Sequence, residues 1–465
     1  MPPANPYRWR RARAAWLLAP LLAALLLHPL VLANPGFFSH DEWERLDHIR
    51  RHGLWDFLRA YSIPHAGPEF GHPVRPIGFV QQGMSALLME SAPFLVHLLD
   101  VLMHGAVASL LALVLHRRGA SLGLALLAGL LFAASPLTAA STGWVAASFD
   151  RWLGLFALLA AGAAWGILSG GTTPGRGLAL AAAAAGAALS KEAAAALPLA
   201  LLLVAGAHRA LHPDGTWPWR RVAAVLVLGS LPVLAYLLVR LPAIEATLAG
   251  RTGVGYYTPT GRFIGRSLSG YWGFPFLPHL TDFPRQGRLG FPAFLGAGLL
   301  HAGLAALAGR WFGWRLGALY VAAYFVFLLP VLPLPEPGAH YLYVSALPLA
   351  VLMAAVWREA WRRRSRLALA VLVAGTGLML TNHALIQWRM HRGGVCQAAF
   401  LPSLDAALAA RSGPIAIVFA PGSLDWVARR AIYLRPAYAE VTLVRGDAPP
   451  TEARPLVMGS DCRLR

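Results

Sequence analysis

An acidic pair, Asp41 and Glu42, stands directly after the first long apolar stretch of the chain. A carboxylate can act as a general base, which takes the proton from a hydroxyl group as that hydroxyl attacks a substrate. Further polar residues stand near the ends of later apolar stretches, namely Asp150, Lys191, Glu192, His340 and Tyr341. If the apolar stretches form a packed bundle, these groups meet at one end of it. Such a cluster at a membrane boundary suits a substrate with a lipid tail and a polar head group.

Each of these residues also has a simpler interpretation. Helix ends attract charges, and long basic side chains near a membrane surface extend their charged groups toward water. Lys191 is the only lysine in the sequence, and the acid Glu192 stands beside it. The two residues either form an ion pair that stabilises a tight turn or contact a ligand, and the sequence favours neither.

Three polar residues recur inside one apolar stretch, at 93–115. His97, Asp100 and His104 are three, four and seven residues apart, so they share one face of a helix. A metal site needs more ligands than this single helix provides. The face therefore predicts either a proton relay or a buried hydrogen-bond patch against a neighbouring helix, and the patch is the favoured interpretation.

Composition identifies the kind of protein that carries these residues. Of 465 residues, 57% are hydrophobic and 13% are charged, whereas soluble domains carry about 25% charged residues. This deficit indicates an integral membrane protein. The formal net charge is +19, but the arginines stand in short clusters between apolar runs, so we expect no nucleic-acid partner.

The sequence predicts about eleven membrane-spanning helices, from apolar stretches close to the roughly 20 residues that a bilayer requires. They lie near residues 14–33, 93–115, 120–138, 152–168, 177–190, 193–207, 222–240, 291–308, 316–332, 341–356 and 367–385. The first has a basic flank but a longer apolar run than a signal peptide. We therefore expect it to remain as an uncleaved anchor.

The distribution of charge predicts how these helices are oriented. With a cytoplasmic amino terminus, the inner segments hold 17 arginines and two acids, Asp214 and Glu359. Basic residues favour the cytoplasmic side of a membrane. The segments 34–92, 241–290 and 386–465, together with the carboxyl terminus, are then expected on the outer side. The inner connections are short, so any chemistry is expected outside.

The outer segments themselves carry signs of structure. After the acidic pair, apolar residues recur at helical spacing among charges, which predicts amphipathic helices on the membrane surface. Arg75-Pro76 then predicts the start of a helix of about fifteen residues, because proline is favoured at the first helical position. The chain is thus an all-α polytopic protein whose membrane domain, 1–385, includes the outer segment 34–92.

The tail, 386–465, differs in kind from the rest of the chain. Its β-rich runs 415–419 and 441–444 flank a helix-like run at 424–434, which predicts a small α/β unit. Both cysteines of the chain, Cys396 and Cys462, lie in this tail. In an oxidising outer compartment they could pair or stay as two free thiols, and the sequence favours neither.

Seven motifs in order resemble the GT-C membrane glycosyltransferases, especially bacterial protein O-mannosyltransferases and their tetratricopeptide-bearing relatives. After Asp41-Glu42 come RPIGF (75–79), FLVHLLDVLMHG (94–105), SPLTAASTGWVAASFDRWLGLFALL (135–159), ALSKEAAAALP (188–198), RSLSGYWGFPFLP (266–278) and AHYLYVSALPL (339–349). Together they cover residues 1 to about 360. Tetratricopeptide repeats do not follow them in this sequence.

The resemblance implies a mechanism and a location. Such enzymes, in the bacterial inner membrane, take a sugar from a polyprenyl-phosphate donor in the bilayer and transfer it with inversion to a hydroxyl of a protein, lipid or glycan acceptor. It implies Asp41 as the base, while Glu42 either supports the base or orients the acceptor. Arg75 is the expected phosphate ligand, and the same donor site is expected to include Asp150, Lys191, Glu192, Arg262, Arg266, His340 and Tyr341. A divalent cation could bridge the acids to the phosphate, but we predict a metal-independent enzyme.

The sequence also departs from the pattern of these relatives. They usually carry asparagine at the position of Asp100, arginine at that of His340, and an arginine near Phe149. These differences bear on how the donor is held. Two other functions stay open: a transporter or flippase of a lipid-linked sugar, which Asp100 would fit best, and an O-antigen ligase or polymerase type of enzyme, against which the early acidic pair argues.

Overall fold

The protein is described here by a computed structural model of its 465 residues. The description covers residues 15–36, 41–62, 74–213, 218–248, 260–277, 286–335, 338–410, 415–432, 441–444 and 455–465. All structural statements below refer to these ranges.

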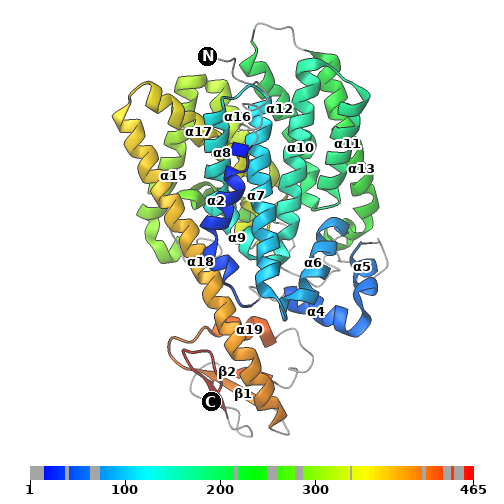
Figure 1. Cartoon of the computed structure of the whole chain (residues 1–465), viewed down its shortest axis with the longest axis vertical. Helices are drawn as coiled ribbons and strands as arrows, with labels where there is room; N and C mark the ends of the chain where they lie inside the picture. Colours follow the sequence, from blue (N-terminus) through cyan, green and yellow to red (C-terminus); the bar gives the residue numbers. More distant parts are fainter. Residues whose placement is uncertain are drawn as a thin grey trace, which may run out of the picture.

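A bundle of apolar helices forms most of the molecule (Figure 1). Seven described helical stretches are long and apolar enough to cross a membrane. Four belong to single helices: α7 (Pro93–Arg117), α13 (Trp219–Leu248, with the span at Trp219–Pro242), α15 (Gln286–Phe312, with the span at Pro292–Phe312) and α18 (Arg366–Ala409). The other three each join an α-helix to a short 3-10 helix: η1 (Val145–Ala147) with α10 (Ser148–Gly170), η2 (Glu192–Ala196) with α12 (Leu197–Leu211), and α16 (Trp314–Phe325) with η6 (Val326–Val331). The pair α8 (Leu122–Ala133) and α9 (Pro136–Gly143), bent by 54°, would make eight. These helices identify a multi-pass membrane protein.

The predicted number of about eleven spans is not confirmed. Each of the eleven predicted stretches contains a helix, but three of these helices are not among the described helices that are long and apolar enough to cross a membrane. They are α2 (Ala19–Leu27), α11 (Pro174–Ala188) and α17 (Ala346–Arg362). Helix α11 consists mainly of alanine and packs closely on α10. The ring of Phe156 occupies the space that a Cβ atom on Gly186 would need. Small residues allow such close approach of helices in membranes.

The remaining helical elements are short connections within or beside the bundle. They are α3 (Pro29–Leu32), η4 (Gly261–Phe263), α14 (Ile264–Gly273), η5 (Phe274–Phe276) and η7 (Ala339–Leu342). The other helices of the described ranges, at 41–62, 76–89 and 425–432, lie at one end of the bundle (Figure 1).

Three helices lie at this end: two cover the segment predicted to form amphipathic helices, and the third starts at the predicted Arg75-Pro76. They are α4 (Asp41–His52), α5 (Leu54–Ser62) and α6 (Pro76–Met89), which pack on one another at the same end of the bundle as the carboxyl-terminal sheet (Figure 1). Helix α6 starts at the predicted proline. One face of it is buried, including Gly78, Gln81 and Gln82, while Val80 and Met84 on the other face are exposed.

The tail forms the predicted small α/β unit. Helix α18 continues without a break past residue 385 to Ala409 and leads into β1 (Ile415–Phe419), α19 (Asp425–Ile432), β2 (Val441–Val444) and β3 (Leu456–Met458). The strands form a parallel sheet in the order β2-β1-β3, with Ile415 opposite Val441. A disulfide joins Cys396 on α18 to Cys462 after β3, which answers the question that the sequence left open.

Candidate functional site

Two buried charges, Lys191 and Asp150, form an ion pair at the end of the bundle where α6 packs. The Lys191 ammonium lies 2.5 Å from a carboxylate oxygen of Asp150, and both side chains are almost fully buried. Asp150 stands in the first turn of α10, while Lys191 lies in the turn between α11 and η2. The same ammonium lies 4.4 Å from the centre of the Tyr341 ring, a distance at which cation and ring attract each other.

A second ionic group lies beside the first along the chain. Glu192 accepts a hydrogen bond of 2.6 Å from Arg75 and pairs with Arg240 of α13 at 3.3 Å. Lys191 and Glu192 are adjacent in sequence, but each pairs with residues of other elements. The contacts of these two residues therefore link the turn to α6, α10 and α13 rather than forming the local ion pair that was one of the two open interpretations. Three cations face two carboxylates here, which leaves one positive charge in excess.

The ring of Phe149 connects this ionic group to helix α4. The guanidinium carbons of Arg75 and Arg45 lie 4.7 Å and 5.7 Å from its centre, respectively. Gly78 of α6 makes room for the ring, because a Cβ atom there would lie 2.0 Å from Cδ1 of Phe149. The glycine of the RPIGF motif is thus required by close packing against the residue that precedes Asp150.

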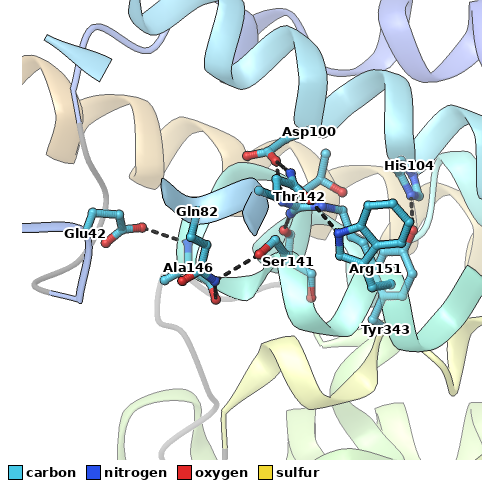
Figure 2. Close-up of polar contacts among 12 residues, drawn as sticks. Glu42, Gln82, Asp100, His104, Ser141, Thr142, Ala146, Arg151 and Tyr343 are labelled. Atoms are coloured by element: carbon cyan, nitrogen blue, oxygen red, sulfur yellow. Dashed lines mark hydrogen bonds and ion pairs between the residues drawn. The ribbon is translucent and has the colours of Figure 1, made fainter. Parts of the chain in front are cut away.

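The acidic pair begins helix α4, and its two carboxylates have different surroundings. Asp41 retains 30% exposure of its side chain and lies 3.8 Å from Arg45. Glu42 is buried, and its Oε1 accepts a hydrogen bond of 3.0 Å from the backbone N–H of Ala146 in η1 (Figure 2). Burial, and then the neighbouring Asp41, raise the pKa of Glu42 to about 7.

The polar face of α7 forms a buried hydrogen-bond patch. Asp100 pairs with the fully buried Arg151 of α10 (Figure 2). One turn further along, Nδ1 of His104 lies 3.0 Å from the hydroxyl of Tyr343, and at the other end His97 contacts the carbonyl of Gly36. The three residues face different partners, as expected for the patch rather than for a continuous relay.

The remaining predicted donor-site residues divide into two groups. His340 and Tyr341 lie beside the Lys191 ion pair, and the His340 ring also makes an edge contact with Trp144, with centroids 4.8 Å apart. Arg262 in η4 and Arg266 in α14 are exposed. The described contacts of Arg262 are with its neighbour Phe263 and do not bring it into the ionic groups.

Sequence reasoning missed several residues that complete the site. Gln81 and Gln82 of α6 hydrogen-bond to α7 and to the start of α10. The available signal was their position on the buried face of a helix that starts at Arg75. The bundle interior also contains three buried histidines in ring contact, His28, His104 and His383. Within the described ranges, no group of three or more His, Cys, Asp or Glu side chains could hold a metal ion.

Comparison with known proteins gives only distant similarity. Neither a protein-family profile nor a curated protein matches the sequence. Among solved structures, this chain is similar to the oligosaccharyltransferase AglB of Archaeoglobus fulgidus in complex with an inhibitory peptide and a dolichol-phosphate, at a TM-score of 0.46 and 12% identity. That alignment covers 93% of this chain and 64% of the other. The apo form of the Archaeoglobus fulgidus enzyme gives a TM-score of 0.44 at 14% identity, with 95% and 65% covered. This chain thus spans less than two thirds of either.

Proposed function

We propose that this protein is an inverting GT-C glycosyltransferase, which moves a sugar from a polyprenyl-phosphate donor to a hydroxyl acceptor at the outer face of the membrane. One observation carries the proposal. A partly exposed carboxylate, Asp41, starts a helix whose Arg45 shares the Phe149 ring with Arg75, and Arg75 belongs to a group with excess positive charge. The proposed base and the proposed phosphate ligand would thus act at the same end of the membrane bundle.

The proposed reaction needs only these two kinds of group. The bond between the anomeric carbon and the phosphate oxygen breaks, and a bond from the acceptor oxygen to the anomeric carbon forms on the opposite face. The acceptor proton passes to the carboxylate of Asp41. The departing phosphate needs positive charge rather than a proton, and Arg75 and Arg240 would supply it once the phosphate competes with Glu192 for them.

Location and partners follow from the same proposal. The donor lies in the bilayer, and its phosphate and sugar reach the ionic groups beside α6. The amino terminus is cytoplasmic, and the tail lies in the periplasm of a bacterial inner membrane, where the Cys396–Cys462 disulfide would form readily. The acceptor is a protein, a lipid or a glycan.

The decisive experiment replaces Asp41 with asparagine. Mass spectrometry of envelope glycans, glycolipids and glycoproteins first compares a deletion strain with the wild type and identifies the missing sugar and its acceptor. We expect Asp41→Asn to reproduce the deletion although the protein is still inserted. Asp47→Asn is the matched control, because Asp47 also pairs with an arginine four residues later, Arg51, on the same helix. Normal glycosylation in the Asp41→Asn strain would remove Asp41 as the base.

Transport of a lipid-linked sugar is the alternative function. The buried pair Asp100–Arg151 favours it, because ionised residues inside membrane-spanning helices often mark a transport pathway. Purified protein in vesicles separates the two functions. Movement of a polyprenyl-phosphate sugar across the bilayer without transfer to any acceptor supports transport, whereas transfer without movement supports the glycosyltransferase.

A further inference from the structure

We propose that Gln81 and Gln82 are positioning residues of the proposed transfer site. Together they fix the segment 146–152, which carries Phe149 and Asp150, against the helix that starts at Arg75. The inference rests on the proposed function, and it concerns side chains that touch neither the expected base nor the expected phosphate ligands. Both glutamines are buried, with 6% and 2% of their surface exposed.

Gln82 holds the start of this segment. Its Nε2 donates hydrogen bonds of 2.9 Å to the carbonyl of Ala146 and 2.9 Å to Oγ of Ser148. The N–H of Ala146 donates to Glu42 on the other side. The backbone of Ala146 is therefore hydrogen-bonded to α6 through its carbonyl and to α4 through its N–H. It directly precedes the helical turn that contains Asp150.

Gln81 holds the end of the segment. Its Oε1 accepts a hydrogen bond of 2.8 Å from the indole N–H of Trp152, and its Nε2 donates one of 2.8 Å to Asp100. Asp100 in turn pairs with Arg151. The hydrogen-bonding partners of the two glutamines thus include residues on both sides of Phe149 and Asp150.

The glutamines stand on the helix that starts at Arg75, so their contacts also determine where Arg75 lies relative to Asp150. Arg75 precedes the first residue of α6, so six or seven residues, less than two helical turns, separate it from the glutamines. Gly78 lies between them and admits the Phe149 ring. One rigid helix therefore sets the place of both the proposed phosphate ligand Arg75 and Asp150, the partner of Lys191. The neutral amide of Gln81 donates through Nε2 and accepts through Oε1, so it joins Asp100 to Trp152 without adding charge.

The test compares Gln81→Met and Gln82→Met with Gln387→Met. Methionine keeps the length of the side chain but loses its hydrogen bonds. Gln387 is the matched control, because it is also buried and donates one hydrogen bond, to the carbonyl of Leu27, from α18. Hydrogen–deuterium exchange by mass spectrometry, on protein in lipid nanodiscs, measures protection of the backbone amides of residues 144–152.

We expect exchange in 144–152 to become about five- to tenfold faster in Gln82→Met, as for the loss of a buried hydrogen bond, and to stay unchanged in Gln387→Met. In the sugar-transfer assay, we expect kcat to fall at least five- to tenfold in both Gln81→Met and Gln82→Met. We expect the Tm of these two variants to fall about as much as that of the control Gln387→Met. Unchanged exchange in 144–152 overturns the inference. Faster exchange with normal kcat overturns it as well.

Failure of the proposed function would be recognised separately. If the wild-type protein transfers no sugar, the proposed function fails, whereas the exchange measurement still decides whether the glutamines fix the segment. The inference as a whole requires both results, faster local exchange and lower kcat.

Discussion

Replacement of Glu42 by glutamine should remove a pH dependence of stability. The Glu42 carboxyl is buried, accepts one hydrogen bond from Ala146, and has a pKa raised from its ordinary value of 4.5 to about 7. A raised pKa means that the folded state binds the proton more tightly than the unfolded state does. The stabilisation is therefore complete below pH 4.5 and is lost as the pH rises to about 7.

The size of the effect follows from the difference between the two pKa values. One pKa unit corresponds to about 1.4 kcal/mol, so the change from 4.5 to about 7 gives about 3 kcal/mol. Glutamine keeps the shape of the side chain but has no charge to bury. We therefore expect the unfolding free energy of the wild type to fall by about 3 kcal/mol relative to Glu42→Gln between pH 4.5 and pH 8.

The assay is thermal unfolding in detergent at pH 5, 6, 7 and 8. We expect the Tm of the wild type to fall relative to that of Glu42→Gln as the pH rises, by on the order of 5 °C in total. Glu90→Gln is the control, since Glu90 is a partly exposed carboxylate paired with Arg50. Parallel Tm curves for the wild type and Glu42→Gln would show that Glu42 is not the buried, proton-binding carboxyl described here.

Three further substitutions test other parts of the site. Arg75→Ala should raise the Kd for the polyprenyl-phosphate donor about tenfold or more, as for a lost charged hydrogen bond, with little effect on the acceptor; equal losses for both substrates would contradict a phosphate-binding role. Gly78→Ala should cost about 1–3 kcal/mol through its clash with Phe149, seen as a lower Tm; an unchanged Tm would refute the tight packing. Arg151→Leu should lower the free energy of unfolding by about 3–5 kcal/mol, because Asp100 loses its cationic partner. The double variant Arg151→Leu/Asp100→Leu should regain much of the lost Tm. A double variant less stable than Arg151→Leu would contradict this.

The sequence predicted the elements with strong periodicity or clear start signals. The apolar stretches coincide with helices because length and hydropathy determine such segments almost alone. The start of α6 at Pro76 and the strands of the tail were predicted from equally local signals. The number of spans was not, because α2, α11 and α17 are shorter than a bilayer-crossing helix usually is.

The partners of the charged residues could not be predicted in the same way. For Lys191 and Glu192 the sequence left a local ion pair and a ligand contact open, and their partners Asp150, Arg75 and Arg240 come from three other elements. Such pairing depends on how helices rotate and approach one another, which periodicity does not encode. The expected donor site included Arg262 and Arg266 only because of the resemblance. Both residues are exposed.

The two adjacent carboxylates of the acidic pair have different surroundings, and we expect them to have different roles. Helical geometry turns neighbouring residues by about 100°, so Asp41 and Glu42 cannot face the same surroundings. Asp41 remains partly exposed next to Arg45, whereas Glu42 is buried and accepts a hydrogen bond from the N–H of Ala146. We therefore expect a crossed result, in which Asp41→Asn loses transfer and keeps the pH dependence of Tm. Glu42→Gln should lose that pH dependence and retain measurable transfer. If Glu42→Gln loses transfer while Asp41→Asn keeps it, Glu42 rather than Asp41 is the base.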